Sequence, residues 1–370
     1  MKVSGLKITR LLTAVTALFT LTFSSCESIY DYEGDCEPKH KVRFVYDMNL
    51  KWADAFPSEV KSVNLYLFDE DGLFVTEYIG RGEELSNPGY LMDLDVPAGK
   101  SYTFVAWGGL YNEGAEKESF TVTDPVEGVT KLDDFICTMN TLTTPPTTKA
   151  GEDAEVAKEY SDSRLYFLYH GMLEDEFLAD DQEGLTYIHT IYLTKDTNHI
   201  RVILQELDHD GIKDPDAFEV SIENVDGVMA YNNDLLGNTP IEFLPWYKAI
   251  DWLGIGSIDE ENATVTNKPG LVTDLSVGRM MDYQKDSMML TIKNKAENKI
   301  VARVPVIQYA LLQRVYYEEA YGHQMSEQEF LDRQDEYVLT FFLQGGKWIY
   351  ATIDILQWRL VIHNYDLEGN

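Results

Sequence analysis

The 370-residue chain has little of three things: cysteine, histidine and positive charge. It holds only three cysteines and seven histidines, and the histidines lie singly along the chain. Three cysteines are too few for the dense disulfide framework of a small secreted domain. The sequence also lacks a G-x-S-x-G motif, an H-E-x-x-H motif and a phosphate-binding glycine loop. It therefore predicts a protein that is not an enzyme and that holds no cofactor and no metal.

Positive charge is scarce: the chain has 30 Lys and Arg but 63 Asp and Glu, which gives a formal net charge of −33. Such a charge repels nucleic acid and anionic membrane, and it keeps an exported protein soluble. Disorder is excluded as well, since hydrophobic residues make up 44% of the chain and aromatic residues 12%. The composition therefore predicts a folded acidic protein that does not bind nucleic acid.

A long apolar run near the N-terminus is also lacking. The hydrophobic stretch Leu11–Phe23 is shorter than the roughly 20 residues that a membrane span needs. Lys2, Lys7 and Arg10 precede it, so residues 1–25 have the order of a secretory signal peptide. We expect this segment to be removed from the mature protein.

Cys26 directly follows Ser24 and Ser25, at the place where a bacterial lipoprotein is cleaved and acylated. Lipid such as palmitate at Cys26 changes the prediction from a soluble protein to a membrane-anchored one. Residues 26–40 are then a lipidated tether, and the cell outer membrane is the expected location. An ordinary signal peptide followed by an incidental cysteine is the alternative.

Cys36 and Cys137 are the cysteines that remain once Cys26 carries lipid. In an oxidising compartment they can form a disulfide that ties the N-terminal segment to the end of the first domain. Two separate buried thiols are the equal alternative, since the sequence gives no distance between them.

Alternating apolar residues predict a mainly β protein. Residues 63–67 have the period of a half-buried strand, and Asp69–Gly72 predicts a tight turn into the next strand. A second hairpin is expected around Pro97–Lys100, between strands at 90–96 and 102–107. Short strands at this spacing indicate β-sandwiches rather than alternating β and α units.

Strand patterning stops in the acidic segment 174–183 and restarts at Tyr187. The sequence therefore predicts an N-terminal β-sandwich at 41–183 and a C-terminal β-sandwich at 184–370. One or two short helices are expected in the second sandwich. The clearer one starts at Ser326-Glu327-Gln328-Glu329, which has the spacing of a capping box.

Six segments of the chain, taken in order, resemble one family. They are Asp35-Cys36, Val60–Asp69, Phe104–Leu110, Leu168–Gly171, Leu193–Val202 and Phe330–Asp332. Together they are similar to the anchor-subunit (FimB-type) fimbrial lipoproteins of the Bacteroidales, relatives of the fimbrillins that build type V pili. The resemblance implies two tandem transthyretin-like β-sandwiches on the outer membrane, which hold the base of a fimbria. It also implies a fimbrial stalk subunit as the partner and a lipid-anchored, surface-exposed location.

The first predicted strand separates an anchor from a stalk subunit. The resemblance implies that stalk subunits lose their lipid and first strand by cleavage after a basic residue. No arginine lies between Cys26 and Arg43, and Arg43 itself falls inside the first strand pattern. We therefore expect the chain to keep its lipid and its first strand. A groove that stays filled cannot accept a neighbour's strand, so the chain is expected to donate one.

The C-terminal segment has the pattern of a strand that could be donated. A predicted strand at 348–362, after the turn at Gly345-Gly346, places Trp358, Leu360 and Ile362 two residues apart. Such a segment can add to an open sheet, where its backbone gives affinity and its alternate side chains give register. The equal alternative is that this strand completes the protein's own second sandwich.

Six tryptophans raise a second hypothesis, a surface glycan-binding lipoprotein. Exposed tryptophans around a shallow acidic groove would favour glycan binding, whereas tryptophans in a filled core would favour the fimbrial role. Trp107 and Trp358 each lie in an alternating pattern and are expected in a sandwich core.

Overall fold

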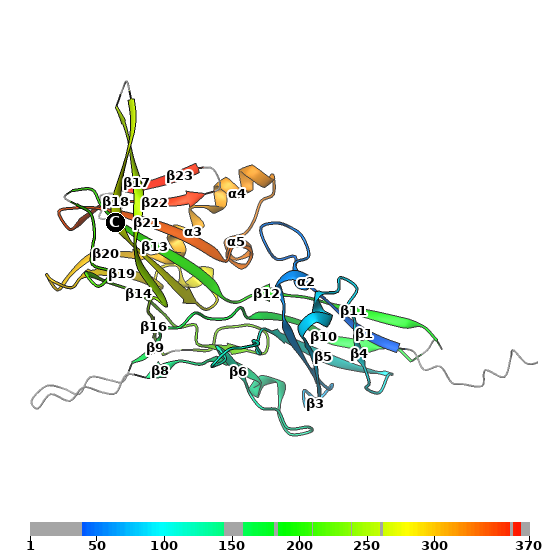
Figure 1. Cartoon of the computed structure of the whole chain (residues 1–370). Coiled ribbons are helices and arrows are strands. Elements are labelled where there is room, and N and C mark those ends of the chain that lie inside the picture. The colour runs from blue at the N-terminus through cyan, green and yellow to red at the C-terminus, as the bar shows by residue number, and fades with distance from the viewer. Residues whose placement is uncertain are drawn as a thin grey trace, which may run out of the picture.

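The computed structural model describes residues 39–143, 158–180, 184–208, 210–237, 239–259, 262–355 and 358–363. These residues form mainly β-strands in five sheets, with a few short helices between them (Figure 1). The predicted fold class, mainly β with short helices in the second half, is confirmed. Within the described ranges no helix has the length and apolar character needed to cross a bilayer.

The first sandwich packs a three-stranded sheet against a five-stranded sheet. The first sheet has the order β11-β1-β4, which are β11 (Thr186–Tyr192), β1 (Lys39–Val45) and β4 (Met92–Leu94). The second sheet has the order β12-β10-β5-β2-β3, which are β12 (Thr194–Lys195), β10 (Tyr169–Leu178), β5 (Lys100–Gly108), β2 (Ser62–Phe68) and β3 (Phe74–Arg81). The first strand, β1, is central in its sheet, because it pairs in parallel with β11 and antiparallel with β4.

The two central strands of the five-stranded sheet, β2 and β5, are buried on both faces. Leu65 of β2 and Phe104 of β5 join the core beneath β1, whereas Tyr66 and Trp107 belong to a second, larger core. All seven residues of β2 are buried, so the expectation of a half-buried strand at 63–67 is wrong: the strand is covered on both faces. Trp107 is 0% exposed, so its predicted place in a core is confirmed.

The second sandwich consists of two six-stranded sheets. One has the order β17-β18-β13-β21-β22-β23, which are β17 (Tyr247–Asp259), β18 (Asn262–Val277), β13 (Asn198–Glu206), β21 (Glu336–Gln344), β22 (Lys347–Ile355) and β23 (Trp358–His363). The other has the order β20-β19-β14-β16-β9-β8, which are β20 (Lys299–Pro305), β19 (Met289–Asn294), β14 (Phe218–Asn224), β16 (Ile241–Phe243), β9 (Glu159–Ser161) and β8 (Leu142–Thr143). Residues of both sheets, such as Val202 of β13 and Ile292 of β19, meet in the larger core.

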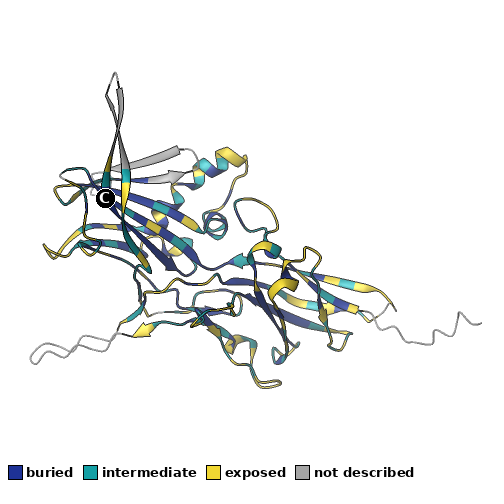
Figure 2. Cartoon of the chain, viewed as in Figure 1, coloured by how far each residue is buried: buried dark blue, intermediate teal, exposed yellow. Residues whose placement is uncertain are grey.

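Smaller elements fill the space around the two sandwiches. A fifth sheet has the order β15-β7-β6, which are β15 (Val228–Ala230), β7 (Ile136–Met139) and β6 (Phe120–Val122). The helices are α2 (Phe56–Glu59), α3 (Val306–Leu311), α4 (Arg314–Tyr321) and α5 (Glu327–Arg333), and the 3-10 turns are η1 (Gly82–Ser86), η2 (Leu132–Asp134) and η3 (Asp282–Gln284). The predicted helix at Ser326 is α5, where the Ser326 hydroxyl accepts a hydrogen bond from the Glu329 amide at 3.0 Å. Buried residues line the inner sides of the sheets, and exposed residues gather at turns and loops (Figure 2).

One predicted hairpin is confirmed and the other is wrong. β2 and β3 pair across the turn at Asp69–Gly72, where the Asp69 carboxylate accepts amide hydrogen bonds and Gly72 has φ +72°. β4 and β5 do not pair, because β4 adds to β1 and β5 lies between β2 and β10. The turn at Pro97–Lys100 therefore carries the chain from one sheet of the sandwich to the other. Alternation of apolar residues identifies the buried face of a strand but not its neighbour.

The division near residue 184 remains a prediction, and strands cross that position in both directions. β11, which follows it, pairs with β1 in the first sandwich. β9, which precedes it, pairs in parallel with β16 in the second sandwich. The chain leaves the first sandwich after β12 and enters the second at β13, between Lys195 and Asn198.

Candidate functional site

Two of the predicted site residues, Cys26 and Cys36, lie outside the described residues. Lipid attachment and the disulfide between Cys36 and Cys137 therefore remain predictions. Cys137 lies in β7 and is 0% exposed, and no disulfide reaches it from the described part of the chain. Burial raises the pKa of its thiol, so little of the reactive thiolate forms at neutral pH.

The other predicted site residues, Trp358, Leu360 and Ile362, lie on β23. The single strand predicted at 348–362 is wrong, because the chain turns back after β22 and β23 pairs with it antiparallel. Ile362 is opposite Ala351 in this pairing, and Ala351 is 1% exposed and belongs to the larger core.

β23 is the last strand of its sheet among the described residues. An edge strand leaves one row of backbone N–H and C=O groups without a strand partner, and another chain can pair with such a row. Strand exchange can thus use this edge in two ways. β23 can leave its own sheet and be donated, or it can stay in place and pair with an incoming strand.

The junction of the two sandwiches contains a buried lysine. Lys195 of β12 contacts the carboxylates of Glu59, from α2, and of Asp335, next to β21, at 2.7 and 2.6 Å. Its side chain is only 4% exposed, and its ammonium lies 4.2 Å from the centre of the Phe167 ring. Burial acts to lower the pKa of Lys195, but the attraction of Asp335 and other neighbours outweighs it and raises the pKa. Lys195 therefore stays charged and links an acid from each sandwich.

A second link joins α5 to the loop that follows β1. The Arg333 guanidinium donates hydrogen bonds to the carbonyl oxygens of Asp47 and Asn49 at 2.9 and 3.2 Å. It also lies over the Trp52 ring, 3.5 Å from the ring centre, and bonds Glu329 within α5 at 3.0 Å. Arg333 is 9% exposed, so these contacts form largely away from water.

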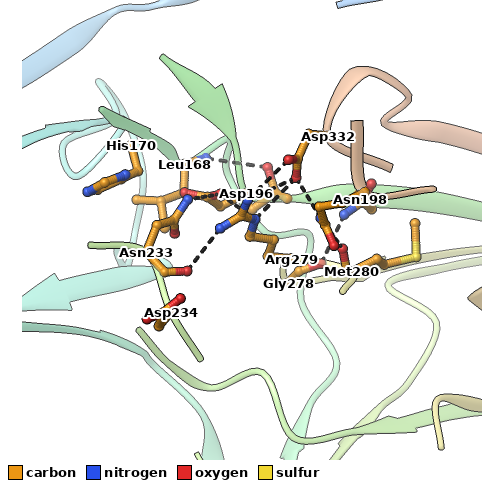
Figure 3. Close-up of polar contacts among 12 residues, drawn as sticks. Leu168, His170, Asp196, Asn198, Asn233, Asp234, Gly278, Arg279, Met280 and Asp332 are labelled. Atoms are coloured by element: carbon orange, nitrogen blue, oxygen red, sulfur yellow. Dashed lines mark hydrogen bonds and ion pairs between the residues drawn. The ribbon is translucent and has the colours of Figure 1, made fainter. Parts of the chain in front are cut away.

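A third group of polar contacts surrounds Arg279, two residues after β18 (Figure 3). Its guanidinium donates to both oxygens of Asp332 at 3.1 Å and to the Asn233 carbonyl at 2.9 Å. Asp196, next to β12, lies 3.6 Å away and accepts a hydrogen bond from the Asn233 amide at 2.9 Å. Burial raises the pKa of Asp196 to about 7, and Arg279 opposes this shift.

These three groups share α5 and its neighbourhood. Asp332 and Arg333 are adjacent in α5, and Asp335 follows the helix. The larger core also runs through the junction, since it holds Trp107 of the first sandwich and Phe330 of α5. Paired buried charges are costly to break, because the partner left behind is then buried without compensation. The junction therefore joins the two sandwiches through a shared core and through paired charges that are costly to separate.

One open groove has an exposed tryptophan. Trp252 of β17 is 69% exposed and lines a groove of about 550 Å³ with Ile250 and Pro269. The charged residues that line it are Asp210, Lys213 and Lys268, so the groove is mixed in charge rather than acidic. The indole gives it an apolar platform of the kind on which sugars can stack.

Comparison with known proteins places the chain in a family. Residues 32–364 match the family described as fimbrillin-A associated anchor proteins Mfa1 and Mfa2. The chain belongs to this family. The predicted resemblance to fimbrial anchor subunits is therefore confirmed.

A curated member of this family is also similar to the chain. It is the minor fimbrium anchoring subunit Mfa2 of Porphyromonas gingivalis, which is 24% identical over 229 residues. The match spans 60% of this chain and 61% of that relative.

Solved structures show the same fold over almost their whole length. A candidate adhesin from Bacteroides thetaiotaomicron is 29% identical with a TM-score of 0.69, and the match covers 90% of this chain and 100% of the other. A candidate polysaccharide-binding protein from the same species is 25% identical with a TM-score of 0.65, covering 89% and 99%. The anchor protein Mfa2 of Porphyromonas gingivalis is 13% identical with a TM-score of 0.54, covering 89% and 99%, which shows the fold alone.

The junction residues of this family member were not found from the sequence. Ser326 and the Phe330–Asp332 segment located α5, but a charged residue at a helix end is ordinarily solvated. Lys195 lies in the Leu193–Val202 segment, yet nothing in that segment names Glu59 or Asp335 as its partners. Only the fold brings together these groups, which are separated by 136 and 140 positions.

Proposed function

We propose that this protein is an outer-membrane lipoprotein, tethered through Cys26, that anchors the base of a fimbria by strand exchange with the adjacent stalk subunit. Membership of the fimbrial anchor family supports the fimbrial role. The observation that carries the anchoring role is the central position of β1 between β11 and β4. It acts non-enzymatically, and its partners are a stalk subunit and the membrane.

Retention of β1 follows from the contacts of that strand. Val42 and Phe44 are 0% and 2% exposed in the core beneath the five-stranded sheet. Loss of β1 would expose this core and leave both β11 and β4 without a partner. Because no arginine lies between Cys26 and Arg43, we expect the chain that leads from β1 back to Cys26 to be kept as well. Such a protein stays at the membrane, where it can hold or end a polymer.

Replacement of Cys26 tests the tether. Cys26→Ser is expected to leave the membrane fraction or to accumulate as an unprocessed precursor, and cells that carry it are expected to shed fimbriae. Cys36→Ser is the matched control, because it removes the nearby cysteine and is expected to leave fractionation unchanged. Outer-membrane fractionation and electron microscopy of fimbriae give the readouts. Membrane-bound Cys26→Ser protein would mean that the tether lies elsewhere.

The strand exchanged with the stalk subunit is proposed to be β23, with Trp358, Leu360 and Ile362 at alternate positions. A chain that ends before Gln357 lacks β23, and a chain that ends at His363 keeps it and serves as the control. The shorter chain is expected to stay folded and membrane-bound but to lose its fimbriae. If it unfolds, β23 is structural. If it folds and still retains fimbriae, exchange through β23 is wrong.

A surface glycan-binding role is the second candidate, and the groove beside Trp252 is the observation that favours it. The similar protein from Bacteroides thetaiotaomicron described as a candidate polysaccharide-binding protein points to the same class of ligand. Trp252→Ala is then expected to abolish binding on a glycan array, while the exposed-site control Tyr283→Ala leaves binding unchanged. Absence of glycan binding by the native protein would remove this candidate.

A further inference from the structure

The outward side of β1 is basic. Residues of this strand alternate, so Val42 and Phe44 enter the core while Lys39, Lys41 and Arg43 are on the opposite side of the sheet. Lys39 and Arg43 are exposed, and within the described residues neither forms an ion pair.

The strands on either side of β1 extend this surface. β11 contributes Ile188, opposite Lys41, and Tyr192, opposite Val45, and these two side chains are 44% and 61% exposed. β4 contributes Asp93, which pairs with Lys41 at 2.6 Å. We call the outward side of these three strands the basic face. Asp93 is its one acid among the described residues, against three cations.

The sign of this face is opposite to that of the whole chain. The protein has 63 acidic and 30 basic residues, so a surface on which cations outnumber acids is a local reversal. At physiological ionic strength the effect of a charge falls off within about 8 Å, so acidic residues farther than this from the face do not cancel it at contact distance. Acids close to the face in sequence, such as Glu37 and Asp95, oppose it. Cations flanked by exposed isoleucine and tyrosine match a surface of lipid phosphates above acyl chains.

The position of the basic face relative to the tether favours a membrane as the surface that it contacts. Lys39, where β1 begins, lies thirteen positions after Cys26. Fully extended, that length spans at most about 45 Å, so lipid at Cys26 keeps β1 close to the membrane. β1, β4 and β11 also form one end of the molecule, away from β20 and the hairpin of β17 and β18 (Figure 1).

We propose that the basic face rests on an anionic membrane surface, with Lys39 and Arg43 at lipid phosphates and Ile188 and Tyr192 at the interface. This inference rests on the proposed tether at Cys26 and adds an orientation to it. The first sandwich then lies against the membrane, and the second sandwich, with β23, points away from it toward the fibre.

Vesicle binding by the chain without its lipid tests the face separately from the tether. The protein used is residues 26–370 with Cys26→Ser, which removes no described residue. It is expected to sediment with phosphatidylcholine vesicles that contain phosphatidylglycerol, and to remain free with pure phosphatidylcholine. Each near-surface cation contributes about fivefold to partitioning, so Lys39→Gln with Arg43→Gln is expected to lower it about 25-fold.

A matched pair of substitutions controls for net charge. Lys299 and Arg303 are exposed on β20 with the same spacing of four residues, and Lys299→Gln with Arg303→Gln changes the charge equally. This pair is expected to change partitioning less than twofold. The proposal that the basic face binds membrane would be refuted if both pairs of substitutions lowered partitioning equally. It would also be refuted if the unsubstituted chain did not bind vesicles at low salt. Membrane fractionation of the lipidated protein would then still decide the tether independently.

Discussion

Arg333 is the residue whose loss tests most directly whether the two sandwiches are locked together. Arg333→Ala removes two hydrogen bonds from a charged group to the carbonyls of Asp47 and Asn49, at 2.9 and 3.2 Å. Hydrogen bonds to charged groups contribute about 1.5–3 kcal/mol each. Contact with the Trp52 ring adds roughly 0.5–2 kcal/mol. Because the carbonyls can partly rehydrate, we expect a total loss of about 3–5 kcal/mol in the free energy of unfolding.

Urea unfolding at neutral pH measures this loss. Arg303→Ala, at an exposed position of β20, is the control and is expected to change the free energy of unfolding by no more than about 0.5 kcal/mol. Arg333→Lys keeps the charge but loses the planar contact with Trp52, so an intermediate loss is expected. In a double-mutant cycle with Trp52→Ala, the coupling between the two side chains is expected to be about 0.5–2 kcal/mol.

The part of the protein that loses structure is as informative as the size of the loss in unfolding free energy. Limited proteolysis of Arg333→Ala is expected to cut the loop after β1 sooner than in the unsubstituted protein, because Arg333 holds that loop to α5. A loss below about 1 kcal/mol, or unchanged proteolysis of the loop, would refute the idea that this contact locks the sandwiches.

Three further substitutions probe the same region. Lys195→Met leaves two carboxylates facing each other without their cation and is expected to cost about 3–5 kcal/mol by urea unfolding. Burial raises the pKa of Asp226 from its ordinary 3.8 to about 7, so its folded form holds a proton more tightly than its unfolded form. The stability that this group contributes is fully present below the pKa of the unfolded state and is lost as pH rises through the pKa of the folded state. Asp226→Asn is therefore expected to stabilise the protein at about pH 8. At about pH 4 the same substitution is expected to change the stability little. Gly109→Ala would place its new methyl carbon 1.8 Å from the Phe167 carbonyl oxygen, whereas Gly114 has a similar positive φ and nothing within 4 Å. Thermal unfolding is therefore expected to show a loss of several kcal/mol for Gly109→Ala but only about 1 kcal/mol for Gly114→Ala.

Local features of the fold could be predicted because a few neighbouring residues determine them. Asp69 and Gly72 specify the turn between β2 and β3 by a carboxylate that accepts amide hydrogen bonds and a glycine with positive φ. Ser326 specifies the start of α5 in the same way, through its own hydroxyl. Each signal is complete within four residues of sequence.

Strand partners could not be predicted, because they depend on chain segments far apart in the sequence. β1 pairs in parallel with β11, and Val42 is opposite His189. Nothing in the alternation of either strand specifies the other, since any strand with one apolar face fits the same pattern. The predicted pairing across the turn at Pro97–Lys100 is wrong for this reason, since β4 and β5 each pair with other strands.

The order of the elements is compatible with the proposed role of an anchor at the end of a polymer. Its first strand is central in a sheet and leads to the predicted lipid, while its last described strand is at the edge of another sheet. A pull on β23 passes through β22 and β21 to Asp335 and α5, which contact Lys195 and the loop after β1. Under the proposed exchange, load would travel through paired backbone and buried ion pairs. A strand exchanged at one end and a lipid held at the other require a connection of this kind, because the fibre detaches wherever the chain between them yields first.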